Sequence, residues 1–246
     1  MVARHDLTTN PALQLELLTV RRGTAFWGRK LNELSDADLD GDTLLPGWTR
    51  RQLVAHIGYN ARAIARLIDW AHTGVENPMY ETPEARNHEI NYGATLSPIA
   101  LRNLYEHSAI HLNVEWRDLP DANWSYQVRT AQGRIVPVSE TIWMRTREVW
   151  VHAVDLDNGA AFTDIPTDVL ERLLGDVTGA WTTRGDDTGL RLVVSDAQAT
   201  QLGDFGASEP EIISGSLASI TAWACGRSTL GITSSRQENP VAPRWI

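Results

Sequence analysis

The stretch from Trp143 to Asp155 restricts the fold of this chain most strongly, because its pattern predicts a helix with charged side chains that face the protein interior. If it is helical, Glu148 and His152 lie one turn apart on one face, with roughly 5–6 Å between their Cβ atoms. Arg145 and Asp155 extend this charged stripe by three residues at either end. Charged groups stay buried only when they have partners. The stripe therefore predicts a fold that brings a partner for Glu148 and His152 from elsewhere in the chain.

Three further amphipathic stretches predict helices ahead of this one. Apolar residues recur at near-helical intervals over residues 11–34. The second helix is marked by a capping-box sequence, Thr49-Arg50-Arg51-Gln52, and we expect it to end at Gly74. Pro98 marks the start of the third long helix, and Pro83 marks an additional helix start before it.

The segment between the third helix and the charged stripe predicts a β-hairpin. Residues 124–136 alternate in polarity around a short turn that contains Gly133. Ser139 is then expected to cap the charged helix, which should fade near Asn158. Four long helices with a hairpin inserted before the last make a four-helix bundle, a fold in which metal sites are commonly built from facing side chains.

The pattern of apolar and polar residues changes after Gly159. Residues 168–181 and 216–225 are helical in pattern, while residues 190–194 and 211–214 are short apolar strand candidates. This mixture predicts a smaller α/β domain. We therefore expect an α+β protein, with a four-helix domain over residues 1–159 and a small α/β domain over residues 160–246.

Charge and cysteine content exclude several classes of protein. The chain of 246 residues has 22 Lys and Arg against 31 Asp and Glu, and the resulting net charge of −9 makes nucleic acid an unfavourable partner. Cys225 is the single cysteine, which rules out an internal disulfide and indicates a reducing compartment. We see no signal peptide and no apolar run long enough to span a membrane. The expected location is the cytoplasm.

His56 is the candidate partner for the charged stripe, because it interrupts the apolar face of the second helix. Its position alone favours a core histidine that is hydrogen-bonded to a neighbour. The sharper hypothesis joins it to Glu148 and His152 as a set of three metal ligands. Three protein ligands leave one coordination position open, as catalytic zinc sites do. The chain has no His-Glu-x-x-His sequence, so peptide hydrolysis is not the first choice.

A second histidine pair competes for the same role. His107 and His111 are spaced by four residues on the third long helix and could also ligate a metal. They stand beside Glu106 and Glu115, on what we expect to be the polar side of that helix. We therefore favour a solvated pair.

Motifs spread over nearly the whole chain share their order and spacing with one known family. They are Gly47-Trp48-Thr49-Arg50, His56 to Asn60, Pro78-Met79-Tyr80, Pro83-Glu84-Ala85-Arg86-Asn87, Ala131-Gln132-Gly133-Arg134, Ser139-Glu140-Thr141, Arg147 to Leu156 and Pro243-Arg244-Trp245. Together they resemble the mycothiol-dependent maleylpyruvate isomerase family. The resemblance implies a DinB-like four-helix metal-binding domain followed by a small α/β domain. It also implies zinc, or another divalent metal, held by His56, Glu148 and His152, and an essential arginine of the second domain that falls on Arg227.

The implied activity is the conversion of maleylpyruvate to fumarylpyruvate in gentisate breakdown, with mycothiol as the thiol cosubstrate. Addition of a thiolate to the cis double bond makes that bond transiently single, so that the adduct can rotate before the thiolate leaves. Cys225 could supply a thiolate, but it lies among Ala222, Trp223 and Ala224, a setting that favours a core residue. A metal-bound small-molecule thiol fits the requirement better.

Two further residues are candidates for supporting roles. Arg86, in a matching motif, could bind a substrate carboxylate, although a surface arginine beside Glu84 is an equal alternative. Asp155 could orient the imidazole of His152, and a solvent-exposed salt bridge is the alternative there.

Two other functions remain open from the sequence. One is a mycothiol S-transferase on the same scaffold, which would consume thiol where an isomerase returns it. The other is a zinc-containing regulator that binds a protein and senses redox state. A single cysteine argues against such a sensor, because a redox sensor normally needs paired cysteines near the metal.

Overall fold

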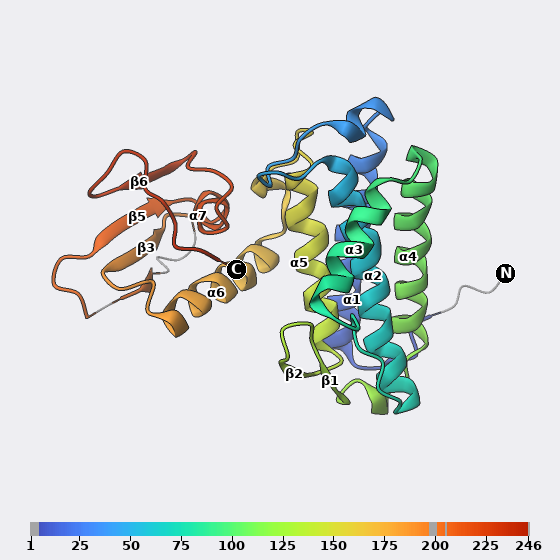
Figure 1. The fold of residues 1–246 in the computed structure, drawn as a ribbon. Coiled ribbons are helices and arrows are strands. Elements are labelled where there is room, and N and C mark those ends of the chain that lie inside the picture. Colours follow the sequence, from blue (N-terminus) through green and yellow to red (C-terminus); the bar gives the residue numbers. More distant parts are fainter. Residues whose placement is uncertain (1–4, 197–200, 205, 246) are drawn as a thin grey trace. The chain divides into compact units, whose positions relative to one another are not determined.

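The computed structural model describes residues 5–196, 201–204 and 206–245 of the chain. The chain divides into two compact units, unit 1 (Met1–Ala160) and unit 2 (Ala161–Ile246). Unit 1 is mainly helical, and unit 2 combines helices with a small sheet (Figure 1).

Unit 1 is built on long helices that follow the predicted stretches closely. Its helices are α1 (Pro11–Asn32), α2 (Arg50–Thr73), α3 (Pro83–Ala94), α4 (Pro98–Asp118) and α5 (Glu140–Asp155), with short 3-10 helices η1 (Ala37–Asp40) and η2 (Asp121–Asn123). In Figure 1, α1, α2, α4 and α5 run side by side as a bundle, and α3 crosses its face. Helix α5 is the element that carries the charged stripe.

The ends of these helices are set by local chemistry. The Thr49 side chain accepts from the backbone N–H of Gln52, whose side chain accepts from the backbone N–H of Thr49, so the predicted capping box is confirmed. Gly74 ends α2 with φ 75°, in the left-handed region where glycine has no steric penalty. Ser139 occupies the N-cap position of α5, as predicted, but its side chain does not cap the helix. Ser139 precedes α5 with φ −55° and ψ −30° and makes no side-chain capping bond, because its backbone is already helical.

The packing of the bundle is uneven. Helix α2 packs along α4 and also contacts α3 and α5, and α1 packs along α5, whereas α1 and α4 touch each other only weakly. The contact of α2 with α5 brings His56 toward the charged stripe. Apolar side chains of α1, α2, α4 and α5 form a continuous core, including Leu17, Ile64, Leu112 and Ile142.

The predicted hairpin is present between α4 and α5. Strand β1 (Gln127–Arg129) pairs antiparallel with β2 (Ile135–Pro137), and Val128 faces Val136 across the pair. Both valines are buried in the bundle core, while their neighbours along each strand are exposed. The hairpin therefore closes one end of the bundle ahead of α5 (Figure 1).

Unit 2 is a four-stranded sheet with helices. Its elements are η3 (Phe162–Asp164), α6 (Thr167–Arg184), β3 (Leu190–Val194), β4 (Gln201–Gly203), β5 (Glu211–Gly215), α7 (Leu217–Ala224) and β6 (Ile232–Ser234). The strand order is β4-β3-β5-β6, with β3 and β5 parallel and the two outer strands antiparallel to their neighbours. The sequence predicted β3, β5, α6 and α7 but not the three-residue strands β4 and β6.

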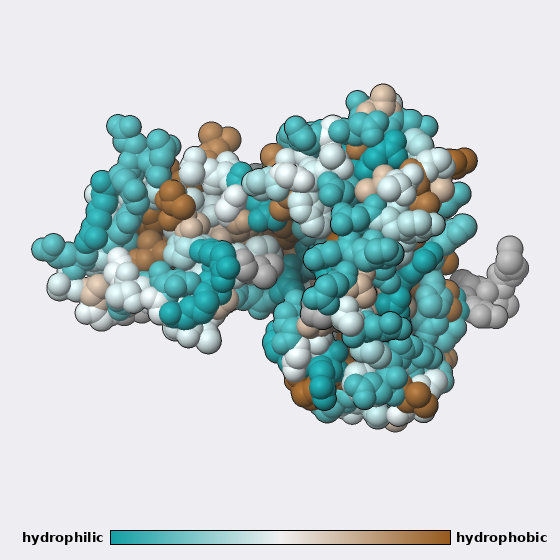
Figure 2. Space-filling view, in the orientation of Figure 1, coloured by the Kyte–Doolittle hydropathy of each residue, from teal (hydrophilic) through white to brown (hydrophobic). Residues whose placement is uncertain are grey.

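The α+β fold class predicted from the sequence is confirmed by this arrangement. The face of unit 1 visible in Figure 2 is mainly hydrophilic, as expected for a bundle that turns its apolar faces inward. No helix within the described ranges is both long enough and apolar enough to cross a membrane.

Candidate metal centre

The charged stripe of α5 meets His56 of α2 in the interior of unit 1. Oε2 of Glu148 lies 2.8 Å from Nε2 of His56 and 3.3 Å from Nε2 of His152. The two imidazole rings stand at 87° to each other with their centroids 5.2 Å apart. All three side chains are largely withdrawn from solvent, with exposed fractions of 6%, 21% and 16% for His56, Glu148 and His152. The structure thus brings together the three residues that the sequence marked as ligands.

Asp155 holds the far side of the His152 ring. Its Oδ2 lies 2.8 Å from Nδ1 of His152, and its side chain is fully buried. Because Nδ1 is engaged by a carboxylate, Nε2 is the nitrogen left to face Glu148 and a metal. A solvent-exposed salt bridge, the alternative for Asp155, does not describe this contact.

The electrostatics of the centre follow from burial and from these hydrogen bonds. Burial alone would raise the pKa of Glu148, but hydrogen bonds from His152 and His56 outweigh it and hold that pKa well below its usual range. Burial opposes protonation of His152, yet hydrogen bonds to Asp155 and Glu148 raise its pKa to about 9. Burial lowers the pKa of His56 despite its hydrogen bond with Glu148. Without a metal, the proton therefore resides on His152, between two carboxylates.

The donor set is suited to a divalent metal. Within the described part of the chain, His56, Glu148 and His152 form a group whose ligand atoms all lie within 4.8 Å of one another. In a tetrahedral zinc site with bonds of about 2.1 Å, ligand atoms stand about 3.4 Å apart. The separations of Glu148 from His56 and His152, 2.8 and 3.3 Å, are close to that value. Two imidazole nitrogens and one carboxylate oxygen are also ligands that zinc accepts.

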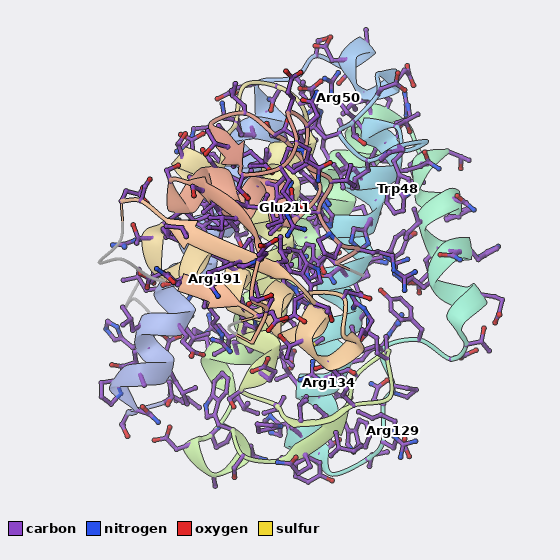
Figure 3. All side chains as sticks on the ribbon, turned by 90° about the vertical axis from the view of Figure 1, so that its left-hand side faces the viewer. Trp48, Arg50, Arg129, Arg134, Arg191 and Glu211 are labelled. Carbon is purple, nitrogen blue, oxygen red and sulfur yellow. The ribbon has the colours of Figure 1, made fainter. Side chains whose placement is uncertain are left out.

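Two aromatic residues beside the centre were not singled out as site residues from the sequence. The ring of Trp48 lies edge-on to that of His56, with centroids 5.7 Å apart at 89°. Figure 3 labels Trp48 and Arg50, which lie just before and at the start of α2, the helix that carries His56. The charge of Glu148 contributes to the electrostatics of Tyr80, although burial is the main cause that raises the pKa of Tyr80 to about 12. Both residues lie within motifs of the family resemblance, which was the one available signal.

Arg86 lies on α3 and is partly exposed. Its Nη1 lies 3.4 Å from Oδ1 of the neighbouring Asn87, and its positive charge also acts on His56 and Tyr80. It therefore stands near the metal centre with its guanidinium only weakly engaged by Asn87. No ion pair with Glu84 is present among the described residues.

Arg227 and Cys225 belong to unit 2. Nη1 of Arg227 donates to the backbone oxygen of Cys225, 2.5 Å away, at the C-terminal end of α7. Cys225 is 3% exposed and packs in the core of the unit. The other candidate ligand pair lies elsewhere, on α4, where His111 is exposed and pairs with Glu115 at 3.2 Å.

Comparisons with known proteins agree with these features. A family model described as the mycothiol maleylpyruvate isomerase N-terminal domain matches residues 20–157. A crystal structure of a mycothiol-dependent maleylpyruvate isomerase is 48% identical, covers 95% of this chain and 97% of its own, and has a TM-score of 0.91. A crystal structure of a histidine-to-alanine mutant of such an isomerase gives the same values. No curated protein matches the chain. The chain belongs to the mycothiol-dependent maleylpyruvate isomerase family.

Proposed function

We propose that this chain is a metal- and mycothiol-dependent cis–trans isomerase that converts maleylpyruvate to fumarylpyruvate in gentisate breakdown. One observation carries the proposal: three metal-ligand side chains converge in a chain that is 48% identical to a mycothiol-dependent maleylpyruvate isomerase. The single cysteine of the sequence favours a cytoplasmic location for this activity.

His56, Glu148 and His152 would hold the metal, and zinc is the ion that we propose. When bound, such an ion supplies Lewis acidity that lowers the pKa of a coordinated thiol. With only three protein ligands, a fourth position is available for the sulfur of mycothiol. Asp155 keeps the imidazole of His152 in the tautomer that offers Nε2 to the ion.

The reaction itself needs a nucleophile that adds and then leaves. The mycothiol thiolate adds to one alkene carbon, and the electron pair of the double bond moves into the adjacent carbonyl to form an enolate. Rotation about the resulting single bond and collapse of the enolate expel the thiolate and restore the alkene as trans. Cys225 is not suited to this role, because it is buried in the core of unit 2.

Positive side chains must offset the two carboxylates of the substrate in a protein of net charge −9. We propose that Arg86 of unit 1 binds one carboxylate. We propose that the small α/β domain contributes Arg227, which would bind a carboxylate bidentately and stabilise the enolate. The assignment of Arg86 rests on a family motif and that of Arg227 on what the family resemblance implies, and guanidinium groups have the geometry for bidentate binding.

Replacement of a ligand tests the metal dependence. We expect His56→Ala to lose both bound metal, measured by elemental analysis, and mycothiol-dependent isomerisation, measured by conversion of maleylpyruvate. His107→Ala, which removes an exposed histidine of α4, is the matched control and should keep both. Full isomerase activity in a metal-free His56→Ala protein would end the proposal.

A thiol balance separates the isomerase from an S-transferase. Wild-type protein is incubated with mycothiol and excess maleylpyruvate, and free thiol is measured as the reaction proceeds. An isomerase converts many equivalents of substrate while the thiol concentration stays constant. Stoichiometric loss of thiol would show instead that the protein is a transferase.

A further inference from the structure

A cavity of about 860 Å³ opens in unit 1 along the line where α1 and α4 touch only weakly. None of the three proposed metal ligands lines it. Its described lining is Val20, Arg21, Thr24, Ala25, Gly28, Arg29, Leu31, Asn32 and Glu33 from α1 and the residue that follows it, Arg102, Tyr105, Glu106, Ala109, Ile110, Leu112, Asn113 and Trp116 from α4, and Arg145 from α5. A volume of this size is typical of pockets for small organic molecules, which span roughly 300–1,000 Å³.

Arg145 is the unusual member of this lining, because only 1% of it is exposed. Its Nη1 donates to the backbone oxygen of Ile57 and to Oδ1 of Asn60, both at 2.8 Å on α2. Both acceptors are neutral. Burial lowers the pKa of Arg145 to about 10, which still leaves the guanidinium charged at neutral pH. The bundle therefore holds a buried positive charge against the cavity.

This buried cation lacks a complete set of partners. Nη2 of Arg145 is buried and has no hydrogen-bond partner among the described residues, and no described carboxylate forms an ion pair with it. A buried donor left unsatisfied is unfavourable, and a buried charge without a counter-ion is more so. An anion in the cavity would supply the missing counter-charge beside this guanidinium.

The remaining lining defines what such an anion should carry. Leu31, Leu112, Ile110 and Trp116 give the cavity apolar walls. Among its described lining residues, four are arginines and two are glutamates, so the local balance is positive in a chain of net charge −9. Apolar walls suit a hydrocarbon body, and the positive balance suits an anionic head group.

We propose that this cavity is a second binding site, distinct from the metal centre, for a small carboxylic acid with an apolar body, whose carboxylate lies beside the buried guanidinium of Arg145. The hydrocarbon part of the ligand lies between α1 and α4. Because no metal ligand lines the cavity, this site does not depend on the proposed isomerase function.

The first test compares two probes that differ in charge. Octanoate carries the carboxylate and an apolar chain, and 1-octanol carries the same chain without the charge. Titration calorimetry on the full-length protein should show octanoate binding at least tenfold more tightly than 1-octanol. Arg145→Met should weaken octanoate at least tenfold and leave 1-octanol nearly unchanged. Equal binding of both probes to the wild type, or no octanoate binding, would overturn the proposal.

The second test leaves Arg145 in place, in case its substitution disturbs the fold. Ala109→Trp adds an indole to the cavity wall on α4, and His107→Trp adds the same group to an exposed position of that helix outside the lining. We expect Ala109→Trp to abolish octanoate binding and His107→Trp to keep it, with unchanged far-UV circular dichroism in both. Octanoate binding that survives Ala109→Trp would place the ligand elsewhere and refute this site.

Discussion

Asp155 and His152 form a buried carboxylate–imidazole pair, with Oδ2 of the aspartate 2.8 Å from Nδ1 of the histidine. They are three positions apart in the last turn of α5, so the pair forms within one helix and needs no other element to align it. The pair does two things at once. It fixes which nitrogen of His152 faces Glu148, and it increases the affinity of that ring for a proton.

Asp155→Asn should weaken metal binding. The amide cannot stabilise the imidazole as a carboxylate does, and removal of such a partner typically lowers metal affinity about 10- to 100-fold. Competition against a chromophoric chelator measures the change in zinc affinity. Asp157→Asn is the matched control, since Asp157 is exposed and has φ 53°, a conformation that asparagine tolerates. An Asp155→Asn protein with wild-type zinc affinity would contradict the role given to this carboxylate.

The metal-free protein should lose stability as the pH rises above neutrality. The pKa of His152 is raised from 6.5 to about 9 in the folded state, chiefly by hydrogen bonds to Asp155 and Glu148 that outweigh burial. The folded state therefore keeps a proton that the unfolded state releases between these values. The stabilisation is fully present below pH 6.5 and declines by up to about 1.4 kcal/mol per pH unit until about pH 9.

Urea unfolding of chelator-treated protein across this range measures the decline. His152→Gln should remove it, whereas His111→Gln, which alters an exposed histidine paired with Glu115, should leave it in place. A free energy of unfolding that is independent of pH between 6.5 and 9 in the wild type would disprove the assignment of this proton to His152.

Trp48 should matter for metal affinity without touching the ion. Its ring lies edge-on to His56, with centroids 5.7 Å apart, and limits the positions that the imidazole can take. Trp48→Ala should lower zinc affinity severalfold, and Trp48→Phe should restore most of the loss because it keeps an aromatic edge. If Trp48→Ala and Trp48→Phe bind zinc equally, the indole has no positioning role.

The elements of unit 1 could be predicted because their signals are local. The capping box at Thr49 and the glycine stop at Gly74 lie within a few residues of the turns that they shape. Ser139 shows the limit of that reasoning, since a residue type favoured at caps adopts helical backbone angles here. Strands β4 and β6 escaped prediction because three residues carry too little periodicity, and these strands are defined by their pairing with β3 and β5.

The site could be predicted in part for a similar reason. The spacing of Glu148 and His152 is a property of one helix, whereas the approach of His56 depends on how α2 packs against α5. The break that His56 makes in an apolar helix face suggested the link as one hypothesis, and the resemblance to the isomerase family, which the comparisons confirm, favoured it over a core histidine. Nothing in the sequence indicated that Nη2 of Arg145 lacks a hydrogen-bond partner among the described residues, because that depends on which acceptors the neighbouring helices place beside it.

Gly23 allows the close packing of α1 on α5, and its substitution should separate them. A Cβ atom at this position would lie 2.6 Å from Nε1 of Trp150 and 2.7 Å from Cγ2 of Val149, and both distances are under 3.0 Å, closer than real Cβ atoms approach other heavy atoms. Overpacking of this kind costs about 1–3 kcal/mol, which should exceed the gain in helix propensity from alanine, about 1 kcal/mol. Gly23→Ala should therefore lower the free energy of unfolding in urea. Gly175→Ala, in a helix where a Cβ meets nothing within 4 Å, should raise it. If both substitutions stabilise the protein, the α1–α5 contact is more yielding than its geometry indicates.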